Sequence, residues 1–316
     1  MELTQRCVLL KVSPFQRPLS MNRRDFIATS AAGALAVPAL SANQNTKPEA
    51  TPAPRVPVAT ADFPITGRLK HSVCRWCYSS MSLEDLCKFS KAMGIASVEL
   101  LGEKEWPTVA AAGLTCAVAN GPTGIGRGWN RVENHDGFVK ETERLLPLMK
   151  AAGIPNMIVF SGNRAGMSDA EGLDNCATGL KRVTPLAEEL GVTIIMELLN
   201  SKIDHHDYMC DRTPWGVELV KRVGSDRFKL LYDIYHMQIM EGDVIRTIRD
   251  NYAQIAHFHT GGNPGRNEID VHQELQYRGI ATAIADLGFQ GYLAQEFIPK
   301  RDPMVSLREA IAICSV

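Results

Sequence analysis

The sequence has almost no net charge and no regular pattern of cysteines. Its 316 residues include 34 basic and 35 acidic side chains, giving a formal net charge of −1 at pH 7. No overall field attracts nucleic acid or an anionic membrane, so we expect neither partner. The eight cysteines are irregularly spaced, which argues against a disulfide scaffold in a chain of this length. We expect free, mostly buried thiols.

Long apolar runs are also missing, except near the N-terminus. There Arg23 and Arg24 precede an apolar, small-residue run over 27–40. This run of roughly 14 residues is too short to cross a bilayer of about 30 Å, and its layout is typical of a signal peptide. The paired arginines are similar to a twin-arginine signal, which exports folded proteins. We expect residues 1–42 to be this signal, starting at Met21, and the protein to be periplasmic.

The rest of the chain is divided between a linker and one large domain. Residues 43–67 are rich in Pro, Thr, Ala and Asn without a hydrophobic period, which predicts a disordered linker. From residue 68 to 316, short β-branched runs alternate with segments of helical period, the pattern of βαβ units. Eight strands are predicted, at 71–75, 97–100, 115–119, 156–160, 193–197, 229–233, 255–259 and 292–296.

This α/β alternation fits two fold classes. About 250 residues is the typical length of one (β/α)₈ barrel. A doubly wound open sheet would alternate in the same way, but no Gly-rich phosphate-binding sequence follows the first strand. Two helices have clear boundaries: Ser82 followed by Asp85 offers a cap for a helix over 82–93, and Gly153 ends a helix over 139–152. We expect the barrel.

Four consecutive predicted strands end in a side chain that can bind a metal ion. These side chains are Glu197, Asp233, His259 and Glu296. The carboxyl ends of parallel barrel strands share one mouth, so residues far apart in the sequence converge there. Charges at the ends of buried strands are costly unless a partner neutralises them. The pattern therefore indicates one divalent cation per chain.

The donor types narrow the choice of metal. Three carboxylates and one imidazole suit a hard or borderline ion, and the thiolates of a structural zinc site are missing. Mn²⁺ or Mg²⁺ is the first choice, with Co²⁺ and Zn²⁺ as alternatives. His236, three residues after Asp233, and Arg266, seven after His259, would stand in the loops above the metal. There they can bind substrate oxygens or a carboxylate.

Together these motifs resemble the xylose-isomerase-like TIM-barrel superfamily, and the hydroxypyruvate isomerases most closely. The motifs are Glu197, Asp233-x-x-His236, His257-Phe258-His259, Pro264-Gly265-Arg266 and Glu296. The resemblance implies that the four strand-end residues bind the metal, that Glu197 and Glu296 exchange a proton with the substrate, and that His236 and Arg266 bind it. The implied substrate is a small sugar or hydroxy-keto acid, with hydroxypyruvate and tartronate semialdehyde as the interconverted pair. The sequence does not determine whether the chain forms a homo-oligomer.

Three other functions compete with this interpretation. A ketose 3-epimerase could use the same metal and glutamates. A non-catalytic exported carbohydrate-binding barrel would not need two metal-bound bases. Related nucleases that cut DNA at abasic sites carry extra histidines for three zinc ions, whereas strands two and three here offer Glu99 and Asn120. Asp270-x-His272 is similar to a nuclease motif but does not replace those histidines.

Several further residues allow both a functional and a structural interpretation. Cys74 and Cys77 form a C-x-x-C spacing, but residues i and i+3 of a strand face opposite sides, so we expect no pairing. Three tryptophans either cover the mouth or pack loops together: Trp76, Trp106 and Trp129. A polar loop that either closes over the site or is solvated contains Asn200, Lys202, His205 and His206. Two glutamates could join the substrate pocket: Glu99 and Glu103.

Overall fold

The structure is a computed structural model that describes residues 67–316. The signal region predicted for 1–42 and almost all of the linker predicted for 43–67 lie outside the described residues. Among the residues described, no helix is long and apolar enough to cross a membrane.

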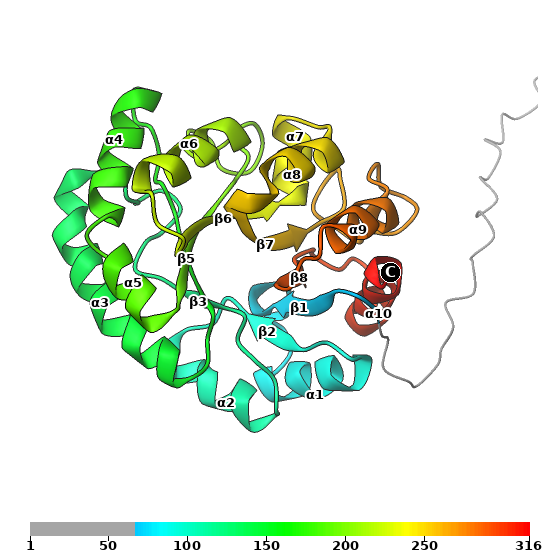
Figure 1. The fold of residues 1–316 in the computed structure, drawn as a ribbon. Helices are drawn as coiled ribbons and strands as arrows, with labels where there is room; N and C mark the ends of the chain where they lie inside the picture. Colours follow the sequence, from blue (N-terminus) through cyan, green and yellow to red (C-terminus); the bar gives the residue numbers. More distant parts are fainter. Residues whose placement is uncertain (1–66) are drawn as a thin grey trace, which may run out of the picture. The chain divides into compact units, whose positions relative to one another are not determined.

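Eight parallel strands form a nearly closed barrel, as the alternating pattern predicts (Figure 1). In the order of the sheet they run β2-β1-β8-β7-β6-β5-β4-β3. Between β2 and β3 single bridges replace a continuous ladder, and Leu100 donates its backbone N–H to Val118 O over 2.8 Å. The strands are β1 (Lys70–Cys74), β2 (Ser97–Glu99), β3 (Val118–Asn120), β4 (Asn156–Val159), β5 (Thr193–Glu197), β6 (Phe228–Asp233), β7 (Ile255–Thr260) and β8 (Tyr292–Gln295).

Helices surround this ring of strands and cover its outer face (Figure 1). The α-helices are α1 (Leu83–Met93), α2 (Trp106–Ala111), α3 (His135–Ala151), α4 (Asp169–Leu180), α5 (Thr184–Leu190), α6 (Thr213–Val223), α7 (Ile234–Met240), α8 (Val244–Asn251), α9 (Tyr277–Asp286) and α10 (Pro303–Cys314). Short 3₁₀ turns are η1 (Arg75–Tyr78), η2 (Glu103–Glu105), η3 (Val132–Asn134) and η4 (Tyr252–Gln254).

The element boundaries follow the sequence signals to within one residue, with two larger differences. Ser82 caps α1 as predicted, and its side chain accepts the backbone N–H of Asp85. The third strand begins at Val118 rather than Thr115, because Thr115 pairs with β2 only through an isolated bridge. Helix α3 begins at His135, four residues before the predicted start, because η3 leads directly into it without a side-chain cap that the sequence could reveal.

The barrel interior holds a small apolar cluster that positions the site. Its buried members are Ala117, Val118, Ile158, Ile195 and Leu231. Successive side chains of a strand point to opposite faces, so Glu197 and Asp233, two residues after Ile195 and Leu231, face the same interior. The apolar cluster therefore forms the floor beneath the charged strand ends.

Candidate active site

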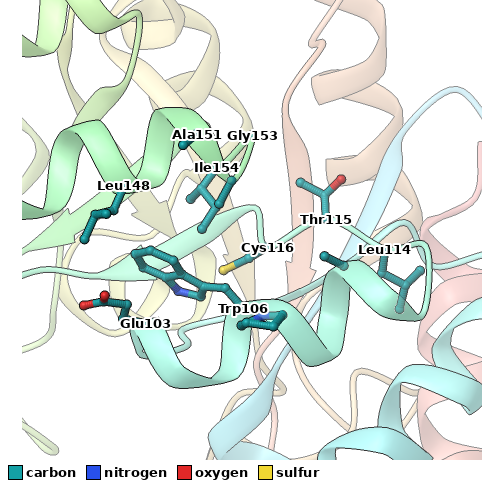
Figure 2. A pocket seen from close by; sticks show the side chains of 12 residues that line it. Glu103, Trp106, Leu114, Thr115, Cys116, Leu148, Ala151, Gly153 and Ile154 are labelled. Carbon is teal, nitrogen blue, oxygen red and sulfur yellow. The ribbon is translucent and has the colours of Figure 1, made fainter.

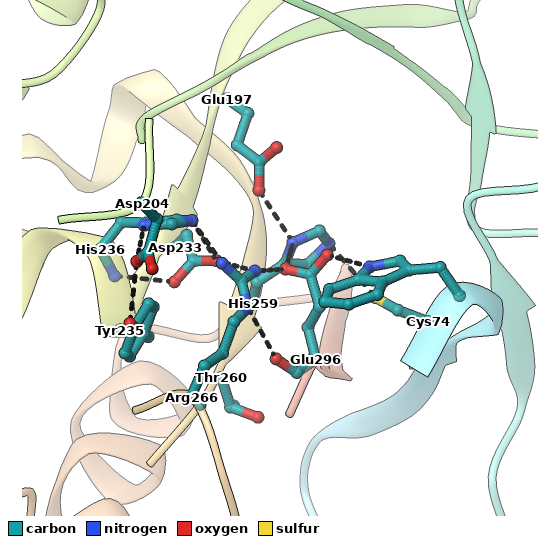
Figure 3. A network of polar contacts seen from close by, with 12 residues as sticks. Cys74, Glu197, Asp204, Asp233, Tyr235, His236, His259, Thr260, Arg266 and Glu296 are labelled. Atoms are coloured by element: carbon teal, nitrogen blue, oxygen red, sulfur yellow. Dashed lines mark hydrogen bonds and ion pairs between the residues drawn. The ribbon is translucent and has the colours of Figure 1, made fainter. Parts of the chain in front are cut away.

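The structure brings the four predicted metal ligands to one point at the carboxyl end of the barrel (Figure 3). Glu197, Asp233, His259 and Glu296 each offer one donor atom, and these atoms lie within 4.8 Å of one another. Nδ1 of His259 lies 2.6 Å from Oε2 of Glu296 and 3.2 Å from Oε1 of Glu197. All four side chains are buried. A donor set of three carboxylates and one imidazole at this spacing fits a divalent cation.

The three carboxylates influence each other's ionisation. Burial raises the pKa of Glu197, and the charge of Glu296 raises it further. Burial also raises the pKa of Asp233, to about 7. Burial acts in the same direction on Glu296, but the positive charges of Arg266 and His259 outweigh it and hold that pKa well below its ordinary value. Burial lowers the pKa of His259, but the charge of Glu296 outweighs it and raises that pKa well above its ordinary value. Within the protein, Arg266 and His259 therefore balance the charge of these carboxylates.

The Asp-x-x-His spacing has a clear structural cause. Asp233 ends β6 and is the N-cap of α7, where its Oδ1 accepts the backbone N–H of His236 over 3.0 Å. Its other oxygen, Oδ2, accepts a hydrogen bond from Nη2 of Arg266 over 2.9 Å. A single carboxylate thus begins the helix and takes part in the polar cluster.

The ring of His236 is held in one orientation by the loop after β5. Oδ1 of Asn200 accepts the backbone N–H groups of Ile203 and Asp204, so its Nδ2 must be the group that faces Nδ1 of His236, 2.6 Å away. On the other side of the ring, Nη1 of Arg266 faces Nε2. Burial lowers the pKa of His236 well below its ordinary value, and Arg266 adds to this, so the ring is neutral. A neutral imidazole has one acceptor nitrogen, so His236 accepts from one of these two donors.

Arg266 points into the carboxylate cluster rather than away from it. Its Nη2 contacts Asp233 and the carboxylate of Glu296, and its Nε donates to Glu296 O over 3.2 Å. The guanidinium also lies over the rings of Trp76 and Tyr235, 5.5 and 5.1 Å from their centroids. Its Nη1 lies 2.5 Å from Nε2 of His236. The guanidinium thus links the carboxylate cluster to the ring of His236.

These residues line a pocket of about 560 Å³ at the barrel mouth. One half carries the polar groups, including His205, whose ring lies 5.2 Å from that of His236. The other half is apolar and comes from the β2 to β5 side: Leu100, Ile125, Ile158, Phe160 and Leu199, with Asn120 among them. Trp76 stands at the rim, 43% exposed, and donates its Nε1–H to Oε1 of Glu296 over 2.7 Å. The sequence marks Trp76 as a cover for the mouth but gives no signal for this bond.

Four of the further candidates do not line this pocket. Trp129 is fully buried and packs on His135 and Phe138. Trp106 and Glu103 line a separate groove of about 590 Å³ between α2 and the C-terminal end of α3 on the outside of the barrel (Figure 2). Glu99 is fully buried in the interior. Sequence position alone cannot tell which way these side chains point.

The loop after β5 is anchored to its neighbours. Lys202 donates to the backbone oxygens of Ile239 and Met240. Asn200 and His205 reach the site, whereas His206 is exposed. Asn200 and His205 thus serve the site, and Lys202 attaches the loop.

The remaining motifs do not belong to the cluster of four ligands. Cys74 and Cys77 are free thiols, but Sγ of Cys74 lies 3.8 Å from Nε2 of His259 and forms with His259 and Glu296 another group able to hold a metal. Asp270 pairs with Arg301 and accepts the backbone N–H of His272. Within residues 67–316, none of the side-chain groups able to hold a metal includes Asp270 or His272. The histidine-rich cluster of a three-zinc nuclease is not formed by these residues.

Comparison with known proteins places this geometry in a family. The family model of the xylose isomerase-like TIM barrel matches residues 88–314, and the chain belongs to this family. Among curated relatives, the 2-oxo-tetronate isomerase of Cupriavidus necator is 36% identical over 110 residues, covering 35% of this chain and 42% of that protein. A Xenopus laevis protein provisionally named a hydroxypyruvate isomerase is 29% identical over 128 residues, covering 40% and 46%. The D-psicose 3-epimerase of Ruminiclostridium cellulolyticum is 31% identical over 121 residues, covering 37% and 38%. The chain thus matches less than half the length of these relatives.

Solved structures agree on the fold. An AP endonuclease of family 2 from Brucella melitensis superposes with a TM-score of 0.69 at 20% identity, covering 76% of this chain and 96% of that one. A D-psicose 3-epimerase from Clostridium cellulolyticum, with D-tagatose, gives 0.63 at 17% identity, covering 78% and 96%. At these identities the likeness shows the fold alone.

Proposed function

We propose that the protein is a metal-dependent isomerase that interconverts α-hydroxycarbonyl compounds or sugars by proton transfer through an enediolate. The convergence of Glu197, Asp233, His259 and Glu296 on one point carries this proposal. A divalent ion bound there, Mn²⁺ or Mg²⁺ by donor type, would polarise the substrate carbonyl and its neighbouring hydroxyl and stabilise the enediolate.

The two glutamates supply the proton transfer. They come from β5 and from the end of β8, so they reach the pocket from different strands, and both line it. One carboxylate removes the proton from the carbon that bears the hydroxyl, leaving the enediolate. The other returns a proton to the adjacent carbon, which exchanges the positions of carbonyl and hydroxyl. Return to the opposite face of the same carbon would instead give epimerisation.

The neighbouring polar groups hold the substrate. Nε2 of His236 and Nη1 of Arg266 face the same region of the pocket, so a hydroxyl group of the substrate can contact both side chains. Trp76 holds Oε1 of Glu296 and leaves Oε2 of this carboxylate facing His259. The arrangement restricts both the substrate and the base to one relative orientation.

The pocket lining limits the substrate class. Arg266 is the one lysine or arginine among the lining residues, and it already contacts two carboxylates. The pocket thus lacks the cationic cluster that a phosphorylated substrate needs. We infer an unphosphorylated substrate, with hydroxypyruvate and 2-oxo-tetronate as the acids indicated by the relatives.

A ketose 3-epimerase is the second candidate, and the size of the pocket favours it. The volume of about 560 Å³ exceeds what a three-carbon acid fills. The D-psicose 3-epimerases among the relatives act on a larger compound by name. The same two glutamates would serve either reaction.

One experiment separates these candidates. Metal-reconstituted protein is incubated in D₂O with hydroxypyruvate, 2-oxo-tetronate and a panel of aldoses and ketoses, and NMR follows deuterium incorporation. Isomerisation places deuterium on the carbon that carried the carbonyl group of the substrate. 3-Epimerisation places it on C3 and inverts the configuration there. No label in any substrate at full metal loading would contradict the proposal.

We also propose that the protein is exported to the periplasm by the twin-arginine route. The proposal rests on Arg23 and Arg24 ahead of the apolar run over 27–40. A metal site of four ligands from four strands forms only in the folded barrel, so filling it before export suits a route that carries folded proteins.

A further inference from the structure

Glu99 lies beneath the metal ligands and contacts one of them from behind. It ends β2, is fully buried, and its Oε1 lies 2.9 Å from Nε2 of His259 and 2.8 Å from Nε2 of His257. Both histidines belong to β7, two residues apart, so their side chains enter the barrel interior on the same face. One carboxylate oxygen thus bridges two imidazoles.

This contact dictates how His259 presents itself to the metal ligands. A ring nitrogen at hydrogen-bond distance from a carboxylate oxygen must carry a hydrogen, so Nε2 is the donor. The remaining nitrogen, Nδ1, faces Glu197 and Glu296, at 3.2 and 2.6 Å, and donates to them. A divalent ion bound by these side chains would replace that hydrogen, because metal ligands bind in their deprotonated form.

We propose that Glu99 is a positioning residue, which fixes the tautomer and ring orientation of His259 and so sets the affinity of the site for its divalent ion. The inference rests on the proposed function, because it requires that His259 binds metal. A carboxylate that accepts the second N–H of a metal-binding histidine orients the ring and strengthens it as a donor, and loss of such a partner typically weakens metal binding by about 10–100-fold.

A second metal site formed by Glu99, His257 and His259 is the competing interpretation, since their donor atoms also cluster. Such a site would require His259 to bind one ion through Nε2 and another through Nδ1. Oε1 of Glu99 lies 2.8 and 2.9 Å from the two nitrogens, and these are hydrogen-bond lengths.

Burial strengthens the case for a role beyond packing. Oε2 of Glu99 and Nδ1 of His257 have no hydrogen-bond partner among the residues described. Burying polar atoms in this way costs free energy that an apolar side chain would avoid. Packing alone would therefore favour an apolar residue at this position.

The test compares two variants of Glu99 with a control at its other partner. Glu99→Gln and Glu99→Met keep a side chain of similar length and fill the same space, so at least one is expected to fold. His257→Gln removes the other imidazole from the same buried cluster but leaves the contact between Glu99 and His259. Mn²⁺ is titrated into each metal-free protein and the free ion is measured by EPR, and circular dichroism gives each melting temperature.

We expect both Glu99 variants to bind Mn²⁺ about 10–100-fold more weakly than wild type, and His257→Gln to stay within a factor of about three. Wild-type affinity in a folded Glu99 variant would overturn the inference, as would an equal loss in His257→Gln. Two ions per wild-type chain, with one lost in Glu99→Gln, would establish the second site instead. A wild-type protein that binds no Mn²⁺, Co²⁺ or Zn²⁺ would overturn the proposed function itself.

Discussion

Trp76 donates its indole N–H to Oε1 of Glu296 over 2.7 Å, although the two residues lie 220 positions apart. Trp76→Phe keeps an aromatic ring at the rim and removes this donor. Hydrogen bonds to charged groups contribute about 1.5–3 kcal/mol, so we expect kcat/KM to fall by about 10–100-fold, with the melting temperature nearly unchanged. Trp106→Phe, on the outer groove, is the control. Equal effects of the two variants on kcat/KM would contradict a role for this bond.

Glu197→Gln and Glu296→Gln should each abolish proton exchange while keeping the fold. Each variant preserves the shape of the pocket and removes a base, and general acid–base groups contribute typically about 10²–10⁴-fold in rate. Because both residues also face the metal point, exchange in D₂O must be compared at saturating metal, with occupancy measured separately. Near-normal exchange in both variants at full occupancy would direct attention to His236 as the base.

His71 should make the protein less stable in mild acid. Burial lowers its pKa from 6.5 to about 4, so the folded protein keeps it neutral while the unfolded chain takes up a proton below pH 6.5. The stability from this group is present at neutral pH and is lost as the pH falls from 6.5 toward 4. Relative to His71→Gln, wild type should lose roughly 2–3 kcal/mol of unfolding free energy between about pH 7 and pH 4.5. Urea unfolding measures this, and His272→Gln, at an exposed site, should behave like wild type.

Export should depend on the paired arginines. Replacement of both Arg23 and Arg24 by lysine keeps the charge but removes the twin-arginine signature. A folded reporter fused to residues 21–62 should then stay in the cytoplasm, whereas the unchanged sequence should carry it to the periplasm. Periplasmic reporter with the lysine pair would show that another route is used.

The sequence predicts the barrel and the meeting of four strand ends because both follow from local patterns. Apolar runs with a charged last residue mark β5 and β6. Because the carboxyl ends of parallel barrel strands meet at one mouth, these charged residues converge. The direction of side chains outside this pattern is not local. Glu99 also ends a strand, yet it lies under the site, and Trp106 and Trp129 turn to the outer groove and the core. These outcomes depend on the packing of distant segments.

The division of the pocket into a polar and an apolar half has a consequence for how the protein can change. The catalytic groups come from the strands after β4, whereas Leu100, Ile125 and Phe160 of the apolar wall come from the earlier part of the chain. Mutations in the wall can therefore alter which compound fits without moving a base or a metal ligand. A library of variants at these three positions would test new substrates while the catalytic groups stay unchanged. This separation of wall and catalytic groups makes the barrel a suitable starting point for directed evolution.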